Sequence, residues 1–428
     1  MPYELTASTL NYVRQHANED VRMLALRGCK DSAVDLPLAL QQIQGRQTAR
    51  KKLPSWAAND AIIYPPHLNL EQCSSEQTAR YKAAICQRLL DKSSDSKFLD
   101  LTGGFGVDFA FMSPLFDDAT YVERDPQLYA IATANFRTLG LNVSTHNADA
   151  SAFPPPHPLT LIYLDPARRD THGVRTYAIA DCSPNILSLK DTLLQSAEYV
   201  LLKLSPMLDW RKAIADLGEQ NVHEVHIVAV NNECKELLIL LSSSPTPPAI
   251  TLHCVNDGDD FTLTLTQEQQ HPSLHPLPLL LEDSGGAFLY EPNAAVMKAG
   301  CFDVLAERYA VAPLAPNSHL FVSPTLIPDF PGRRFLITAI SSLNKRDIKL
   351  HLGSLRQANI TTRNFPLSVA ELRRRLKLAD GGNTYIFATT LADGFHTLIL
   401  CTPQNSAEKF GGLQKCSYLC ARNDVDEE

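Results

Sequence analysis

Apolar and polar positions follow two different spacings along this chain, and the change between them predicts how it is organised. In the first 65 residues, apolar side chains recur every three or four positions, the spacing of one helix face. Within this region, Asp35-Leu36-Pro37 predicts a helix that begins after an Asp35 N-cap. From residue 71 to about 257, short apolar runs alternate with helical patterns, which predicts βαβ units around a parallel sheet.

The apolar runs of this central region predict seven strands, followed by a second unit of different character. The predicted strands are 98–101, 119–123, 142–150, 159–164, 199–205, 225–230 and 250–255. A proline-rich stretch at 271–278 predicts a linker. Beyond it, the apolar runs at 285–292, 335–340, 385–390 and 396–400 predict strands of a small α+β unit.

The end of the first predicted strand carries the most informative chemistry. Asp100 closes the apolar run, and Gly103, Gly104 and Gly106 follow it in a loop where a ligand can approach the backbone. The spacing Asp100-x-x-x-Gly104-x-Gly106 is typical of the nucleotide loop of S-adenosylmethionine (SAM) enzymes, with Asp100 binding the ammonium group. We expect side chains at Gly104 or Gly106 to occupy the place of the ligand. A dinucleotide-binding loop needs a third glycine where Phe109 stands, and no P-loop lysine follows.

Three further strands end in an acid of the type that such a site uses. Glu123 ends the second strand, 17 residues after Gly106, where an acid can accept hydrogen bonds from both ribose hydroxyls. Asp149, next to Ala150, follows the third strand and is placed to accept a hydrogen bond from the adenine amino group. Asp165-Pro166 ends the fourth. A glycine-rich turn with surface acids is the alternative, but four strand ends in this order favour a SAM site.

These motifs resemble those of bacterial class I SAM-dependent methyltransferases that end in a THUMP-like domain. The resemblance lies in 100–108, in Val122-Glu123-Arg124-Asp125 and in 164–169, and more loosely in the 70–82 segment that contains Thr78. It implies that Thr78, Thr102, Gly103, Arg124 and Ala150 join the cofactor-binding residues. It also implies a methyltransferase for which RNA is the substrate, without specifying a nucleotide.

The resemblance also implies a fold and a domain plan. The fold is an α/β, Rossmann-like core with a seven-stranded sheet whose last pair is antiparallel. An N-terminal helical region precedes it, and a C-terminal α+β unit, ferredoxin-like and THUMP-like, follows it. The expected domains are a helical region at 1–70, the methyltransferase at 71–270, a ferredoxin-like segment at 280–330 and a THUMP-like, RNA-binding domain at 331–428.

Composition narrows the class of protein. With 428 residues, 44% hydrophobic and 20% charged, the chain is long enough for two or three globular domains. No apolar run approaches the roughly 18 residues of a membrane span, and no signal peptide is visible, so we expect a cytoplasmic protein that contacts no membrane. The ten cysteines show no paired framework, and Cys416-x-x-x-Cys420 lacks a second ligand pair, so we expect reduced thiols and no structural metal. Cys73 and Cys182 are expected to be buried thiols.

Charge is unevenly distributed, which bears on the choice of partner. Residues 331–380 hold eleven Lys or Arg and three Asp or Glu, a net charge of +8, whereas the whole chain carries −8 and the remainder therefore −16. A basic unit on an acidic body is typical of a local contact with nucleic acid. A solvated helix face is the alternative. The residues predicted to contact RNA are Lys345, Arg346, Arg363, Arg373, Arg374, Arg375 and Lys377.

The predicted chemistry is methyl transfer to a base nitrogen, with Asp165, Pro166 and Arg168 as the catalytic residues. Asp165 and the carbonyl group near Pro166 orient the nitrogen nucleophile, and Arg168 stacks on the target or holds a phosphate. The Asp-Pro sequence lacks the second proline and the aromatic residue of amino-group methyltransferases, a role that Tyr177 could take. Two alternatives remain open: a protein or small-molecule methyltransferase, and a non-catalytic RNA adapter that binds SAM.

Overall fold

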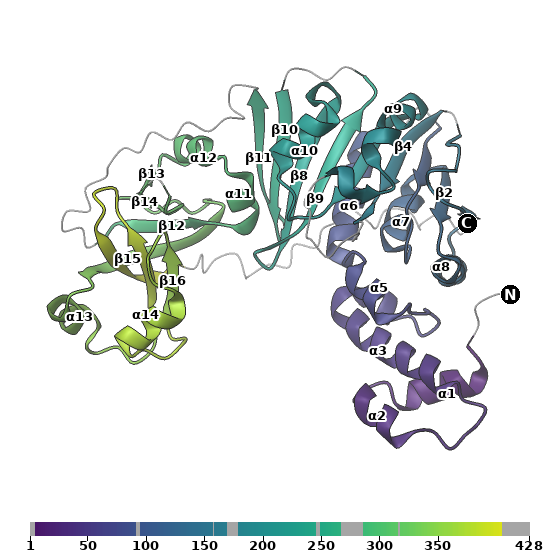
Figure 1. Cartoon of the computed structure of the whole chain (residues 1–428), viewed down its shortest axis with the longest axis horizontal. Coiled ribbons are helices and arrows are strands. Elements are labelled where there is room, and N and C mark those ends of the chain that lie inside the picture. The colour runs from purple at the N-terminus through teal and green to yellow at the C-terminus, as the bar shows by residue number, and fades with distance from the viewer. Residues whose placement is uncertain are drawn as a thin grey trace, which may run out of the picture. The chain divides into compact units, whose positions relative to one another are not determined.

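The computed structural model describes residues 5–90, 95–156, 158–168, 179–244, 249–266, 286–315 and 317–404. The chain divides into two compact units (Figure 1). Unit 1 comprises residues 1–257 and 262–270, and unit 2 comprises 258–261 and 271–428. Within the described ranges, no helix has the length and apolar character needed to cross a membrane.

Among residues 5–90, unit 1 has six helices, and side chains cap the first turns of four of them. Asp35 accepts a hydrogen bond from the Leu38 amide at 3.0 Å, so the predicted N-cap is confirmed. Thr6, Asp20 and Ser75 cap three other helices in the same way. The helices of this region are α1 (Ala7–Gln15), α2 (Val21–Arg27), α3 (Leu36–Lys52), α4 (Pro54–Ala57), α5 (His67–Gln72) and α6 (Glu76–Leu89).

A nine-stranded sheet forms the centre of unit 1, in the order β11-β10-β8-β9-β7-β4-β1-β2-β3. Its strands are β1 (Lys97–Asp100), β2 (Asp118–Glu123), β3 (Ser144–Asn147), β4 (Leu159–Leu164), β7 (Ala197–Leu204), β8 (Val222–Val230), β9 (Glu233–Ser242), β10 (Ala249–Asn256) and β11 (Asp259–Thr266). Strands β3-β2-β1-β4-β7 are parallel, and β9 runs antiparallel between β7 and β8. The class I methyltransferase sheet is therefore present, extended by β10 and β11.

The structure corrects the prediction of which strand closes the seven-stranded arrangement. The sequence assigned this place to 250–255, but that segment is β10, an eighth strand that lies parallel to β8. The antiparallel strand is β9, which the sequence analysis missed. A two-residue turn at Asn231-Asn232 joins β8 to β9, with φ values of 52° and 59°. Both angles suit the left-handed turn of a tight hairpin, which asparagine tolerates better than most residues.

The helices that connect these strands pack on the two faces of the sheet. They are α7 (Val107–Met112), α8 (Pro126–Thr138), α9 (Ile186–Ser196) and α10 (Trp210–Leu217). Helices α6, α7 and α8 share a core with one face, where Phe109 and Phe136 pack against Tyr121. Helices α9 and α10 lie over the sheet in the view of Figure 1. Beyond β4, the short strands β5 (Ala167–Arg168) and β6 (Cys182–Ser183) pair antiparallel.

Unit 2 is built on a seven-stranded sheet in the order β13-β14-β12-β15-β18-β17-β16. Its strands are β12 (Phe288–Pro292), β13 (Ala312–Pro313), β14 (Phe321–Ser323), β15 (Gly332–Ser342), β16 (Asn359–Arg363), β17 (Tyr385–Thr390) and β18 (His396–Pro403). Its helices are α11 (Ala294–Ala299), α12 (Phe302–Tyr309), α13 (Lys345–Leu352) and α14 (Val369–Leu376). Leu352 of α13 and Leu372 of α14 share a core with β16, β17 and β18. Because β12 pairs with β15, the residues before and after 331 belong to one sheet.

Candidate active site at the strand ends

The loop after β1 depends on three glycines for three different reasons. A Cβ at Gly103 would lie 1.9 Å from the ring of Tyr121, so this glycine permits close packing. A Cβ at Gly106, where φ is +84°, would lie 2.7 Å from the ring of Phe136. At Gly104, φ is +56° and the nearest atom to an added Cβ is the Thr102 carbonyl oxygen at 3.9 Å. A side chain at Gly104 would thus enter the open space beside the loop, and whether a ligand occupies that space stays a prediction. The same expectation for Gly106 is wrong, because its Cβ points into the core.

Asp100 presents an unsatisfied carboxylate oxygen at the base of this loop. The residue is 1% exposed, and its Oδ1 accepts a hydrogen bond from the Thr102 amide at 3.0 Å. Its Oδ2 is buried and has no hydrogen-bond partner among the described residues. Burial raises the pKa of Asp100 well above its ordinary range, and the nearby acids Asp108, Asp165 and Glu123 add to the effect. A ligand ammonium group would satisfy this oxygen and relieve its unfavourable burial.

Glu123 is held by backbone amides at the end of β2. Its Oε2 accepts a hydrogen bond from Gly104 and its Oε1 from Asp125, each at 2.7 Å. Each oxygen keeps lone-pair capacity for a further donor such as a ribose hydroxyl. Asn147, a residue that the sequence analysis missed, donates through Nδ2 to the Glu123 and Arg124 carbonyl oxygens at 2.7 and 3.1 Å. These bonds connect the end of β3 to the end of β2.

The remaining predicted cofactor residues are less closely connected with the loop. Asp149 lies two residues beyond β3, where it accepts hydrogen bonds from the Ser151 amide and hydroxyl at 2.9 and 2.5 Å. The Ser151 hydroxyl lowers the pKa of Asp149. Ala150 is part of the same turn, and Arg124 is exposed. Thr78 is buried in the first turn of α6, where its amide and hydroxyl bond to the capping residue Ser75.

Asp165 lies directly beside the glycine loop. Its amide donates to the Thr102 hydroxyl at 2.6 Å, which ties the end of β4 to the loop that follows β1. Its carboxylate accepts a hydrogen bond from the ammonium group of Lys203, on β7. Pro166 follows in the chain, and the backbone of Arg168 belongs to β5. Tyr177 lies outside the described residues, as do 271–278, Gly285, Cys416 and Cys420. We call Asp100, Thr102, Gly104, Glu123 and Asp165 the strand-end site.

A buried charge network adjoins the strand-end site, and it consists of Ser74, Lys82, Asp108, Tyr163 and Glu236. The Lys82 side chain is fully buried, and its Nζ lies 3.2 Å from Asp108 Oδ1 and 2.5 Å from Glu236 Oε2. The Ser74 hydroxyl lies 2.8 Å from Asp108 and 3.1 Å from Glu236. Tyr163 donates to Asp108 at 2.8 Å. These contacts join α6, α7, β4 and β9 beneath the ends of the strands.

The network also sets the protonation of the lysine beside Asp165. Burial alone would lower the pKa of Lys203, but the carboxylates of Asp165, Glu236 and Asp108 outweigh it and raise that pKa. Burial likewise works to raise the pKa of Asp108, but Lys82 and Lys203 outweigh it and lower that pKa below its ordinary value. Lys203 is therefore a cation at neutral pH. It adjoins the site through contacts that no local sequence spacing reveals.

One group of three potential metal ligands occurs among the described residues, on β8 and β10. The ligand atoms of Glu224, His226 and His253 lie within 4.8 Å of one another. Arg88 already binds both carboxylate oxygens of Glu224, each at 2.5 Å. Burial lowers the pKa of His226 to about 4. Since the guanidinium group compensates the charge of Glu224, we interpret this group as a buried structural network.

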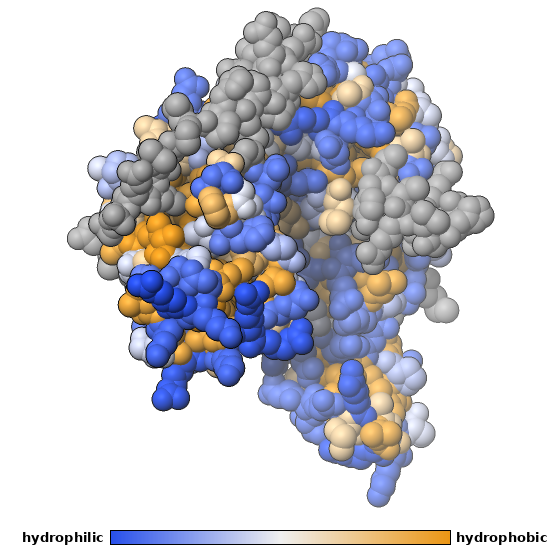
Figure 2. Space-filling model, turned by 60° about the vertical axis from the view of Figure 1, so that its left-hand side comes forward, coloured by the Kyte–Doolittle hydropathy of each residue, from blue (hydrophilic) through white to orange (hydrophobic). Residues whose placement is uncertain are grey.

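The seven basic residues predicted to contact RNA occupy unit 2, but two of them form ion pairs within it. Arg363 pairs with Glu291 of β12 at 2.8 Å, and Arg373 pairs with Asp380 at 2.6 Å. Lys345, Arg346, Arg374, Arg375 and Lys377 are exposed, on or directly after α13 and α14. Figure 2, in which unit 2 comes forward, shows strongly hydrophilic residues gathered over its lower part, where Figure 1 places these two helices.

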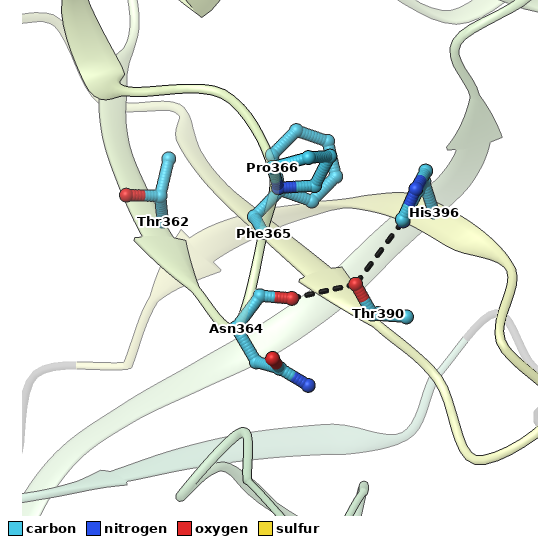
Figure 3. A pocket seen from close by; sticks show the side chains of 6 residues that line it. All are labelled: Thr362, Asn364, Phe365, Pro366, Thr390 and His396. Atoms are coloured by element: carbon cyan, nitrogen blue, oxygen red, sulfur yellow. Dashed lines mark hydrogen bonds between the residues drawn. The ribbon is translucent and has the colours of Figure 1, made fainter.

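A pocket of about 460 Å³ also lies in unit 2 (Figure 3). It is formed where β16 and β17 end and β18 begins. The Thr390 hydroxyl bonds to the Asn364 carbonyl oxygen at 2.5 Å and to His396 Nδ1 at 3.1 Å. The residues that line it are Thr362, Asn364, Phe365, Pro366, Thr390 and His396. None of them was predicted from the sequence to contact a ligand.

Two sequence families match the C-terminal unit. A model described as a ferredoxin-like domain matches residues 288–331, and one described as THUMP domain-like matches 332–403. Among proteins with curated descriptions, none matches the chain.

Solved structures extend the similarity to most of the chain. A protein from Porphyromonas gingivalis W83, assigned as a methyltransferase, shares 32% identity, covering 93% of this chain and 98% of its own, with a TM-score of 0.79. A class I SAM-dependent methyltransferase assigned in Listeria monocytogenes shares 11% identity over 59% of this chain and 93% of its own, with a TM-score of 0.34. The second similarity is too distant to support an argument about this chain.

Proposed function

The chain belongs to the family of bacterial class I SAM-dependent methyltransferases with a C-terminal THUMP-like domain, and we propose that it methylates RNA at a base nitrogen, in the cytoplasm. The observation that carries this proposal is the strand-end site. An orphaned carboxylate oxygen of Asp100, an open cradle at Gly104 and the ion-paired Asp165 come together there. Ligands of open α/β sheets bind at these carboxyl ends of strands.

The residues present fit the cofactor. Asp100 would bind the ammonium group of SAM, Gly104 would lie against its amino-acid part, and Glu123 would accept from its ribose hydroxyls. Asp149 and Ala150 would contact the adenine. When bound, SAM supplies an electrophilic methyl group on a positively charged sulfur. The acids around the site would favour this cationic ligand electrostatically.

Asp165 performs the central role in this proposal. Its carboxylate accepts a hydrogen bond from the N–H of the target base, which directs the nitrogen lone pair away from the carboxylate. As the nitrogen gains a bond to carbon it becomes positively charged, and the carboxylate stabilises that charge and accepts the proton. Pro166 has no amide hydrogen and a restricted φ, so the carbonyl groups beside it can serve as further acceptors. Arg168 would stack on the base or hold a phosphate.

The RNA part of the proposal is supported by unit 2. The THUMP-like match covers residues 332–403, the region that holds the exposed Lys345, Arg346, Arg374, Arg375 and Lys377. Exposed cations contact phosphates and supply affinity without sequence readout. Because Arg363 is paired with Glu291, we leave it out of the proposed RNA surface. That surface then consists of exposed residues on α13 and α14 and at their ends.

The experiment that tests this function uses purified full-length protein, tritiated SAM and RNA from cells that lack the gene. Label in one size class of RNA supports the proposal, and Asp165→Asn should lower the rate of labelling steeply while SAM still binds. Asp118→Asn is the matched control, because Asp118 is exposed at the start of β2, at the opposite end of the sheet strands from Asp165. Label in protein or in small molecules, or SAM binding without any transfer, would overturn the proposal in favour of another acceptor or of an RNA adapter.

A further inference from the structure

Lys203 occupies an unusual position for a lysine. It lies on β7, next to β4 in the sheet, and its side chain is 11% exposed. Its ammonium group donates to the Asp165 carboxylate, the proposed contact of the acceptor nitrogen. A long side chain that could reach solvent is instead held at the carboxyl ends of the central strands, at the cost of desolvating its charge.

We propose that Lys203 is a positioning residue for methyl transfer, whose ammonium group aims the Asp165 carboxylate at the acceptor and favours its ionised form. This inference rests on the proposed function. An unpaired carboxylate in the same place would be free to rotate about its side-chain bonds and would take up a proton more readily, since burial disfavours its charged form. A protonated Asp165 could not accept the proton that the methylated nitrogen must lose.

Charged groups from several elements face this pair, and together they explain why Lys203 remains a cation. Glu236 of β9 and Asp108 of α7 act with Asp165 to favour the charged form of Lys203. Lys82 of α6 pairs with Glu236 and Asp108, which leaves Lys203 as the cation bonded to Asp165. The other titratable groups that influence this pair or are influenced by it are Lys52 of α3, Cys73 before α6, Asp100 of β1 and Tyr163 of β4.

The first test measures single-turnover transfer by four variants: Lys203→Met, Lys203→Gln, Lys203→Arg and Asp165→Asn. We expect Met and Gln to lower the rate about 100-fold, the scale of losing one charge-stabilising group in an active site. Arg restores the cation and should recover most of the rate. Lys190→Met is the matched control, because Lys190 is also largely buried and bonds only to the Leu217 carbonyl and Asp191 among the contacts described for it.

The double variant Lys203→Met with Asp165→Asn decides whether Lys203 acts through Asp165. If it does, the double variant is no slower than Asp165→Asn alone, because the second change removes a partner of a group already lost. Independent roles would instead multiply the two losses, and that result would overturn the proposal. So would a Lys203→Gln enzyme with wild-type rate.

A binding measurement tests the same idea without needing an acceptor. SAM and S-adenosylhomocysteine share the ammonium group, but only SAM carries the sulfonium charge that an ionised Asp165 would attract. The ratio of their affinities, measured by calorimetry from pH 5 to 9, therefore reports the charge of Asp165. As the pH is lowered, this ratio of SAM affinity to S-adenosylhomocysteine affinity should fall when Asp165 takes up a proton. In Lys203→Met we expect the fall to occur at a pH about one unit or more higher. An unchanged profile would overturn the role of Lys203 even if RNA proves to be the wrong acceptor. If the wild-type protein binds SAM but transfers no methyl group to RNA, only the proposal that RNA is the acceptor is overturned.

Discussion

The cradle beside Gly104 leads to a sharp prediction, because the chain contains a matched glycine elsewhere. Gly104 has φ of +56° and Gly140, in the loop after α8, has φ of +70°. At Gly104 an added Cβ meets only the Thr102 carbonyl oxygen at 3.9 Å, and at Gly140 it meets no atom within 4 Å. The two substitutions to alanine therefore create similar backbone strain and no steric clash in the free protein.

The magnitude follows from this geometry. A non-glycine residue in the left-handed region costs about 1–2 kcal/mol, so both variants should lose this much unfolding free energy. Only Gly104→Ala adds a methyl group in the place proposed for the cofactor. Overpacking by one methyl group costs about 1–3 kcal/mol, which corresponds to a loss of SAM affinity of roughly 5- to 150-fold.

The assay combines chemical denaturation with calorimetric titration of SAM. The expected result is equal destabilisation of the two variants and weakened binding in Gly104→Ala alone. If Gly104→Ala binds SAM as tightly as Gly140→Ala, the space beside Gly104 is not the cofactor site, and the assignment of the loop is wrong. Gly103→Ala provides a contrast, because its Cβ would strike the ring of Tyr121 and should destabilise the fold far more.

Three further predictions concern charge. Because the pKa of Asp100 is raised, the free protein binds a proton there at pH values below that pKa, and an ammonium ligand displaces it. The affinity for SAM should therefore rise with pH until the pKa of Asp100 is passed. Calorimetry should show that Asp100→Asn removes this pH dependence of SAM affinity. Lys82→Met leaves Asp108 and Glu236 buried without their shared cation and should cost about 3–5 kcal/mol in urea denaturation, far more than Lys190→Met. Reversing the charges of Arg374 and Arg375 should reduce crosslinking to RNA without loss of stability, whereas Arg137→Glu should leave the crosslinking unchanged. Arg363→Glu should instead destabilise unit 2, because Arg363 pairs with Glu291.

The features that local sequence could predict are those with a local cause. An apolar run that ends in an acid and glycines is readable because strand, carboxylate and turn are adjacent in the chain. This is why Asp100, Gly104, Glu123 and Asp165 could be named as candidates, whose roles remain predictions. The class of the fold followed from the same alternation and from the resemblance, and the structure and the comparisons confirm it.

The features that it missed depend on contacts between distant residues. Glu236 meets Lys82 across 154 positions, and Lys203 meets Asp165 across 38. Nothing beside these residues in the chain distinguishes them from surface charges. Similarly, Arg363 contributed to a basic run in the sequence, but its partner Glu291 lies 72 positions away. A local signal for β9 did exist, since a second apolar run at 237–241 follows the run at 225–230 after six residues, and these six begin with Asn231-Asn232, a pair that suits a hairpin turn.

The pairing of β12 with β15 determines how the C-terminal part of this protein can be divided. Phe288 to Pro292 pair with Leu336 to Gly332, and Leu289 and Val322 share a core with Phe335, Phe387 and Ile399. A fragment cut at residue 331 would leave an open strand edge and an uncovered apolar face on both pieces. The ferredoxin-like and THUMP-like segments thus form one folded unit, although two different sequence families match them. Transplanting either one, in the laboratory or during evolution, requires taking both.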